Sequence, residues 1–132
     1  MSKILVFGSR SIQDKDFVIN NLVKVVGEMQ DCGDPIEFMS GGASGVDSII
    51  SDFANEYEYP IEEYLPAYEK FGKRATLMRN EDMAETCDFA LCFWDGESRG
   101  TMHTLMTLAK LGKITTVYGY KQREGKYVSN KI

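Results

Sequence analysis

Cysteine and histidine are scarce in this chain, and their scarcity argues against two kinds of site. Its three cysteines, Cys32, Cys87 and Cys92, are odd in number and form no C-x-x-C pair. That pattern argues against a disulfide framework and against a zinc site. The single histidine, His103, weakens any proposal of a histidine-based metal site. We therefore predict no metal, no cofactor and a reducing, cytoplasmic environment.

Long apolar runs are also missing. None approaches the roughly 20 residues that a helix needs to cross a bilayer, so we expect no membrane partner. The first residues, M-S-K-I-L-V-F-G, have too short an apolar part for a signal peptide and are expected to form a strand. With 132 residues, 43% apolar and 27% charged, the composition is that of one globular domain in the cytoplasm.

Positive charge is in short supply overall. The chain has 15 basic and 20 acidic residues and a net charge of −5, which disfavours a protein that coats nucleic acid. We therefore do not expect nucleic acid as a partner. The net charge says little about small ligands, because local clusters of basic residues can oppose the total. Several basic residues lie in or next to the loops described below: Arg10, Lys70, Lys73, Arg74, Arg79 and Arg99.

Short apolar runs alternate with helical periodicity along the chain. The pattern predicts strands at 3–7, 36–39, 61–65, 89–93 and 114–118, with the third at an edge of the sheet. Helices are predicted from Asp14, as N-cap, to the breakers at 31–35, then over 46–54 and 71–85, and in a last helix that Gly112 ends. This alternation predicts an α/β domain over 1–118, with a parallel sheet of about five strands and helices on both faces.

Two segments carry more specific expectations. In the last helix, Met102, Leu105, Met106 and Ala109 are spaced to form one apolar face. The segment 119–132 is polar and basic, and a terminal strand, a partner-binding arm and disorder all stay open for it.

Three glycine-containing loops follow predicted strands, at 8–10, 40–47 and 95–101. In a parallel sheet such loops all lie at the carboxyl edge, and ligands bind there near the point where the strand order reverses. We therefore expect the three loops to converge on one cleft. A loop between a strand and a helix also directs backbone N–H groups and the positive end of the helix toward an anion.

The first loop is Gly8-Ser9-Arg10. Its glycine lets a phosphate approach the backbone, its serine can donate a hydrogen bond, and its arginine can hold a phosphate through two hydrogen bonds. A plain turn with a surface arginine is the alternative.

The second loop contains Gly41, Gly42 and Gly45, but its spacing is not G-x-G-x-x-G and it lacks the lysine of a P-loop. A tight turn without a ligand is its alternative. Asp47 follows in the first helical turn, where the helix dipole favours a carboxylate but the carboxylate would repel a phosphate. Asp47 therefore either faces a ribose hydroxyl or only stabilises the helix.

The remaining candidates lie near the last two predicted helices. Arg79 and Asn80 form an adjacent pair able to donate to an anion and to a hydroxyl or base edge, although a solvated amphipathic helix also explains them. Trp94 can either cap the core or stack on a base. Ser98, Gly100 and Thr101 offer hydrogen-bond donors at the start of the last helix.

Short motifs occur in a fixed order along most of the chain. Between Ile4 and about Val117 they are G-S-R, G-G-A-S-G-V-D, P-A-Y, G-K-R-A, R-N-E-D-M, W-D-G-E-S-R-G-T and A-K-L-G-K. This set resembles the SLOG superfamily, and more narrowly its YspA/YpsA-related branch. The resemblance implies a Rossmann-like domain that binds nucleotides or nucleotide-derived molecules at its glycine loops.

Members of that superfamily include the Lonely-Guy phosphoribohydrolases, DNA-processing protein A, which binds single-stranded DNA, and sensor domains of bacterial defence systems. By similarity, Gly100 and Thr101 match the phosphate loop, and Arg79 matches an arginine of the hydrolases' catalytic pair. The hydrolases carry G-G-x-G-T-x-x-E, whereas this chain has Thr104 in place of the glutamate. Glycosidic hydrolysis needs a carboxylate to stabilise an oxocarbenium-like centre and activate water.

Three functions follow as expectations. The first is binding of a nucleotide or nucleotide-derived ligand by a sensor or sequestering protein. The oligomeric state of such a protein stays open, and a homo-oligomer is one possibility. The alternative is an N-glycosidic hydrolase or transferase that uses Arg79 with Asp47, Asp95 or Glu97. A weaker alternative is binding of single-stranded nucleic acid. The predicted ligand-binding residues are Gly8, Ser9, Arg10, Gly41, Gly42, Gly45, Asp47, Arg79, Asn80, Trp94, Ser98, Gly100 and Thr101.

Overall fold

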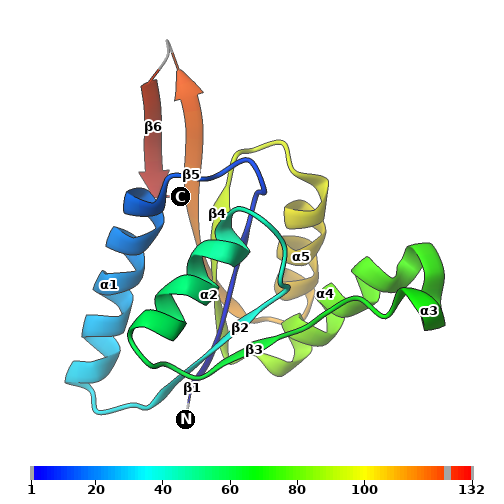
Figure 1. Cartoon of the computed structure of the whole chain (residues 1–132), viewed down its shortest axis with the longest axis horizontal. Coiled ribbons are helices and arrows are strands. Elements are labelled where there is room, and N and C mark those ends of the chain that lie inside the picture. The colour runs from blue at the N-terminus through cyan, green and yellow to red at the C-terminus, as the bar shows by residue number, and fades with distance from the viewer. Residues whose placement is uncertain (1, 124–125, 132) are drawn as a thin grey trace.

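The structure is a computed structural model, and it describes residues 2–123 and 126–131. Its strands form one sheet in the order β3-β2-β1-β4-β5-β6 (Figure 1). The strands are β1 (Ser2–Gly8), β2 (Ile36–Ser40), β3 (Ile61–Glu63), β4 (Phe89–Trp94), β5 (Ile114–Arg123) and β6 (Lys126–Lys131). The first five are parallel and β6 is antiparallel to β5. The predicted α/β class, Rossmann-like and with a parallel sheet, is confirmed.

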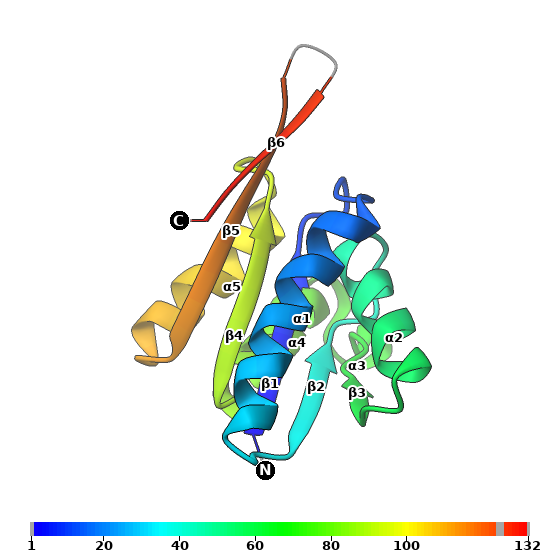
Figure 2. The ribbon, with the colours of Figure 1, turned by 90° about the vertical axis from the view of Figure 1, so that its left-hand side faces the viewer.

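Helices cover both faces of the sheet (Figures 1 and 2). Helices α1 (Lys15–Asp31) and α2 (Val46–Glu56) pack on one face, whereas α4 (Ala75–Thr86) and α5 (Arg99–Lys110) pack on the other. None of the helices in the described part has the length and apolarity needed to cross a membrane. The predicted N-cap at Asp14 is confirmed, because its Oδ1 accepts a hydrogen bond of 3.1 Å from the N–H of Phe17.

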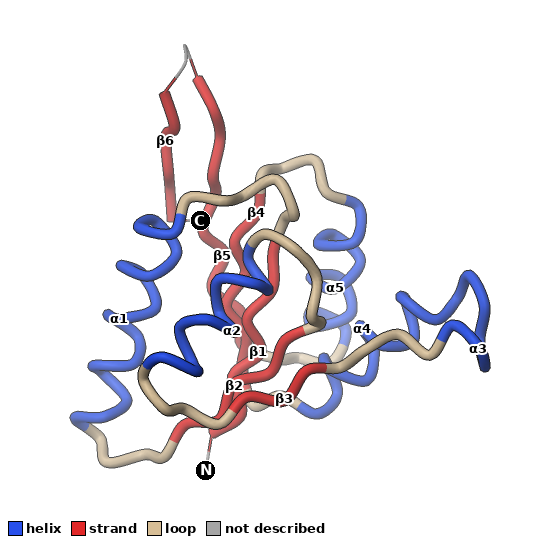
Figure 3. Tube along the Cα trace, in the orientation of Figure 1, coloured by secondary structure: helices blue, strands red, loops and turns tan. Residues whose placement is uncertain are grey.

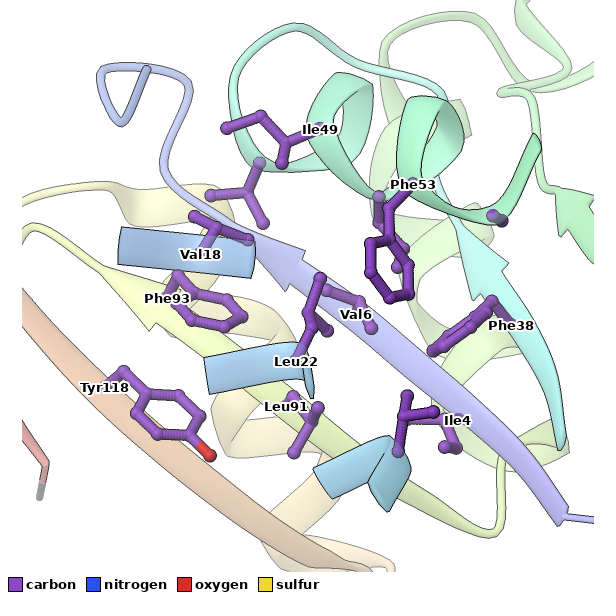
Figure 4. Packing of buried hydrophobic residues seen from close by; sticks show 14 of the residues in the cluster. Ile4, Val6, Val18, Leu22, Phe38, Ile49, Phe53, Leu91, Phe93 and Tyr118 are labelled. Atoms are coloured by element: carbon purple, nitrogen blue, oxygen red, sulfur yellow. The ribbon is translucent and has the colours of Figure 1, made fainter. Parts of the chain in front are cut away.

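Side chains of the central strands alternate between two cores. Ile4 and Val6 of β1 point into the core beneath α1 and α2, where Phe38, Phe53 and Phe93 also pack (Figure 4). Leu5 and Phe7 point to the opposite core, and Leu5 lies beside Met39 of β2 and Ala90 of β4. Because both faces of these strands are buried, the strands are apolar runs rather than alternating ones.

The predicted single helix over 71–85 is wrong at its start. The structure has a short helix α3 (Tyr68–Phe71), then a 3₁₀ turn η1 (Gly72–Arg74), and only then α4. Gly72 has a φ of 59°, a backbone conformation that interrupts a right-handed helix. The break gives α4 its own start, one turn before Arg79.

The apolar face predicted for the last helix, α5, is not the face that the structure buries. Met102 and Met106 are 40% and 53% exposed, and Ala109 is exposed as well, whereas Leu105 is half-buried. The buried side chains are instead Thr101, Thr104 and Leu108. The two threonines can be buried because their hydroxyls donate to the Oγ of Ser98 (3.0 Å) and to the carbonyl of Gly100 (3.1 Å).

A glycine follows the end of helix α5, whereas the end of strand β5 is set by its pairing with β6. Gly112, with a φ of 69°, follows α5, and the N–H of Lys113 closes the helix on the carbonyl of Leu108 (3.0 Å). Strand β5 continues beyond its predicted end at Tyr118 to Arg123 and pairs with β6. The segment 119–132 thus contains the end of β5 and all of β6, while residues 124, 125 and 132 lie outside the described residues.

Candidate functional site

The loops after β1, β2 and β4 meet at the carboxyl edge of the sheet. Figure 3 shows these loops in tan at one end of the strands. Strand order reverses between β1 and β4, because the chain adds β2 and β3 on one side of β1 and β4 and β5 on the other. A cavity of about 370 Å³ opens there, lined by residues from all three loops and from α4. This is the position at which parallel α/β sheets bind ligands.

The structure brings most of the predicted site residues to this cavity. Those that line it are Gly8, Arg10, Gly41, Asp47, Arg79, Asn80, Asp95, Ser98, Gly100 and Thr101. Those that do not line it are Ser9, Gly42, Gly45, Trp94 and Glu97. Thr104 lines it too, but its hydroxyl donates to the carbonyl of Gly100.

Two of the glycines serve contact between loops. A Cβ on Gly8 would lie 2.1 Å from the carbonyl oxygen of Phe93 in β4. Gly45 has a φ of 74°, and a Cβ on it would lie 2.6 Å from the carbonyl oxygen of Arg10. These distances are too short for a side chain, so the glycines let the β1–α1 loop pack against β4 and against the start of α2.

Ser9 and Asp95 join the first loop to the third. Ser9 is fully buried, and its Oγ accepts a hydrogen bond from the N–H of Asp95 (2.9 Å). Asp95 Oδ1 accepts from the N–H groups of Glu97 (2.8 Å) and Ser98 (2.9 Å), and its Oδ2 accepts from the hydroxyl of Ser11 (2.7 Å). Partial burial raises the pKa of Asp95, but these hydrogen bonds outweigh it and lower the pKa below its ordinary value.

Trp94 is half-buried at the end of β4 and packs against the core beneath α4 and α5. Its indole N–H donates to the carbonyl oxygen of Ser98 at 3.3 Å. The geometry is that of a side chain that caps the core and holds the third loop. Glu97 is exposed and does not line the cavity.

The start of α5 faces the cavity without an acidic side chain in its first turn. Ser98 is the N-cap, and its Oγ accepts from the N–H of Thr101 at 3.4 Å. The N–H groups of Arg99 and Gly100 donate to no described residue. A Cβ on Gly100 would meet nothing within 4 Å, so the backbone is openly accessible there.

The start of α2 differs, because it carries a buried carboxylate. Asp47 is only 7% exposed, and its Oδ2 accepts from the N–H of Ala43 at 3.1 Å. Its Oδ1 is shielded from water and has no hydrogen-bond partner among the described residues. Burial raises the pKa of Asp47 from 3.8 to about 6, against the opposing effects of the Ala43 bond, Arg79 and Arg10.

Arg79 and Asn80 lie beside this carboxylate. Nη1 of Arg79 donates to the carbonyl oxygens of Gly41 (2.6 Å) and Tyr64 (3.1 Å), and its Nε donates to Oδ1 of Asn80 (2.9 Å). Burial lowers the pKa of the Arg79 guanidinium. Arg79 Nη2 and Asn80 Nδ2 make no hydrogen bond to a described residue. The arginine thus ties α4 to the second loop and keeps one donor nitrogen available.

Sequence reasoning missed several lining residues, chiefly Phe7, Ser11, Ala43, Thr76 and Met83. Thr76 and Met83 lie three or four residues from the Arg79–Asn80 pair, so helical spacing could have placed all four on one face of α4. The others have no such signal, because their positions depend on how the loops pack.

His103 lies outside the cavity. Its Nε2 is 3.9 Å from a carboxylate oxygen of Glu81 on α4, and its Nδ1 is buried with no hydrogen-bond partner in the described part of the chain. Within residues 2–123 and 126–131, no three His, Cys, Asp or Glu side chains are grouped to hold a metal ion. The polar groups that line the cavity are backbone N–H groups, hydroxyls, the Asn80 amide, the carboxylates of Asp47 and Asp95, and the two arginines.

No family model matches the chain, and no curated protein is similar enough to match it. Function is therefore inferred from the residues and their geometry.

Proposed function

We propose that this protein binds a nucleotide or a nucleotide-derived molecule in the cavity, as a sensor or a sequestering protein. Three features support the proposal: the position at the reversal of strand order, the side chains of Arg10 and Arg79, and the unpaired N–H groups at the start of α5. A volume of about 370 Å³ suits a small ligand. The resemblance to the SLOG superfamily also supports the proposal, because members of that superfamily bind such molecules.

The contrast between two helix starts carries the proposal. Both α2 and α5 begin at the cavity, and both present the positive end of a helix dipole. The first turn of α2 contains Asp47, which repels an anion, whereas the first turn of α5 contains no acidic residue. The Asp95 carboxylate lies just before α5, but its oxygens are already engaged by the N–H groups of Glu97 and Ser98 and by the hydroxyl of Ser11.

A phosphate group therefore binds at the free N–H groups of Arg99 and Gly100. Both donors of Thr101, its N–H group and its hydroxyl, are engaged by Ser98. The rest of the ligand extends toward Asp47. The SLOG resemblance assigns the phosphate loop to Gly100 and Thr101, so the two assignments share Gly100.

Replacing Gly100 by valine tests the phosphate position. A Cβ at this position meets no atom within 4 Å. Because Gly100 lines the cavity beside the free N–H groups, the added methyl groups should narrow the approach to them. We expect Gly100→Val to lower the affinity for ribonucleoside mono- and diphosphates by at least about tenfold, the effect of losing one or more charge-assisted hydrogen bonds. Isothermal titration calorimetry measures the affinities.

Gly27→Val in α1 is the matched control, because Gly27 is also a helical glycine with no atom within 4 Å of an added Cβ. The control should bind as the parent protein does. Undiminished affinity of Gly100→Val would place the phosphate elsewhere and contradict the proposal.

A second candidate function is hydrolysis or transfer at an N-glycosidic bond. A buried carboxylate with a pKa raised to about 6, near an arginine in a cavity, is the observation that favours it. Of the carboxylates considered, Asp95 has both oxygens engaged in hydrogen bonds and Glu97 lies outside the cavity, which leaves Asp47. Incubation with nucleoside monophosphates followed by chromatography tests this candidate. Free base that Asp47→Asn abolishes would support it, whereas binding without release of base would exclude it.

A further inference from the structure

The buried carboxylate of Asp47 lacks a partner for one of its oxygens. Oδ2 accepts a hydrogen bond from the N–H of Ala43, and Oδ1 accepts none from the described residues. Polar atoms that are buried in native proteins are almost always hydrogen-bonded, so an unpaired carboxylate oxygen at a cavity needs an explanation. Asp47 lines the cavity, so a group of a ligand seated there is able to supply the donor that the unpaired oxygen lacks.

Stabilisation of α2 does not explain the burial of this side chain. A carboxylate in the first turn benefits from the helix dipole when it is exposed, without the cost of losing its hydration. Asp47 is 7% exposed, and no salt bridge joins it to Arg79 or Arg10 among the described residues. Burial therefore costs more than the helix dipole and the nearby arginines recover, as the raised pKa indicates.

Two unused donors lie on the same side of the cavity. Nη2 of Arg79 and Nδ2 of Asn80 make no hydrogen bond to a described residue, although the other polar groups of both side chains are engaged. Arg79 is held close to Asp47, since a Cβ on Gly41 would lie 2.8 Å from Arg79 Nη1 and 3.1 Å from Asp47 Oδ2. One strong acceptor beside two donors is the complement of hydroxyl groups, because a hydroxyl both donates and accepts.

We propose that Asp47, together with Arg79 and Asn80, selects ligands that present ribose hydroxyls at the α2 side of the cavity. One hydroxyl donates to the Asp47 carboxylate, and the hydroxyl oxygens accept from the two nitrogen donors. This inference rests on the proposed function, because it takes a phosphate at the start of α5 as the other end of the ligand. A site that hydrogen-bonds a hydroxyl rejects analogues without it, because its polar groups are then left unpaired.

The experiment compares ribonucleotides with their deoxy counterparts. Affinities of the full chain for AMP, CMP, GMP and UMP are measured by calorimetry or by NMR shifts, beside those for the 2′-deoxy and 3′-deoxy forms. We expect removal of at least one of the two hydroxyls to weaken binding by about tenfold or more. We expect Asp47→Asn to weaken binding of the ribonucleotides and to remove most of their preference over the deoxy forms.

Asp52→Asn is the matched control, because Asp52 is an exposed aspartate on the same helix and does not line the cavity. It should keep both the affinity and the preference. The comparison in the unchanged protein needs no variant, so the test holds even where Asp47→Asn folds poorly.

Two failures are distinguishable. Equal affinity for ribo and deoxy forms, with binding still lost in Gly100→Val, would overturn the role of Asp47 and leave the proposed function standing. Absence of binding for all the nucleotides would overturn the proposed function and this inference with it.

Discussion

At the scale of single residues, the fold shifts the pKa of the Asp47 carboxyl group strongly. Its pKa is raised from 3.8 to about 6, because burial outweighs the Ala43 hydrogen bond, Arg79, Arg10 and Gly41. The folded state thus binds the proton more tightly than the unfolded state does. The charged form of Asp47 therefore lowers the free energy of unfolding. This loss of stability develops as the pH rises from about 4 to 6, and it is fully present above pH 6.

Asp47→Asn should therefore stabilise the protein at neutral pH. Removing a charge with this pKa shift raises the free energy of unfolding by an amount on the order of 3 kcal/mol at pH 7.5. Near pH 4 the gain should fall below about 1 kcal/mol, because Asp47 is then protonated in the fold and partly protonated in the unfolded chain. Urea unfolding at the two pH values measures the difference, with Asp52→Asn as the control. A variant less stable than the parent at pH 7.5 would show that the charged carboxylate supports the fold.

At the scale of elements, the loops differ in what their glycines do. Gly8 and Gly45 permit contact between backbones, whereas Gly100 leaves space at the cavity. The same residue type therefore serves packing in two loops and access in the third. Hydrogen bonds of Asp95 with Ser9 and Ser11 hold the third loop against the first, and the bond from Trp94 to Ser98 holds the third loop to the end of β4.

Alanine at two of these glycines should separate the roles. Gly8→Ala places a Cβ 2.1 Å from a backbone oxygen that cannot move freely, so we expect a loss of about 3 kcal/mol, at the upper end of overpacking costs. Gly100→Ala lies within α5 in open space and should be neutral or stabilising by about 0.5 kcal/mol. Thermal unfolding of both variants measures this. Equal effects at the two positions would contradict the division of roles.

At the scale of the whole molecule, one sheet joins two cores. Leu22 of α1 is fully buried in one core and Leu108 of α5 in the other, and alternate residues of the same strands contribute to both. The cavity lies where the two layers of helices begin, at the carboxyl edge of their shared sheet. Its lining includes residues of α2 from one layer and of α4 and α5 from the other.

Because the strands are shared, the protein should unfold as one cooperative unit. Leu22→Ala and Leu108→Ala should each lower the free energy of unfolding by about 2–5 kcal/mol, as deletions of buried leucine side chains do. Trp94 fluorescence and far-ultraviolet circular dichroism should report the same transition in both variants. Met106→Ala is the control, since Met106 is 53% exposed. Separate transitions for the two signals would show that the layers unfold independently.

The sequence by itself determined the α/β class, the five parallel strands and the N-cap at Asp14, because these follow from periodicity and from contacts between near neighbours. It also predicted that the three loops offer backbone N–H groups, hydroxyls and an arginine to a ligand. Only the tertiary structure decided that β1 lies between β2 and β4, that Gly8 and Gly45 face other backbones, and that α5 buries its threonines. Those outcomes, like the burial of Asp47, depend on atoms far away in the chain, and no local pattern of residues records where such atoms will lie.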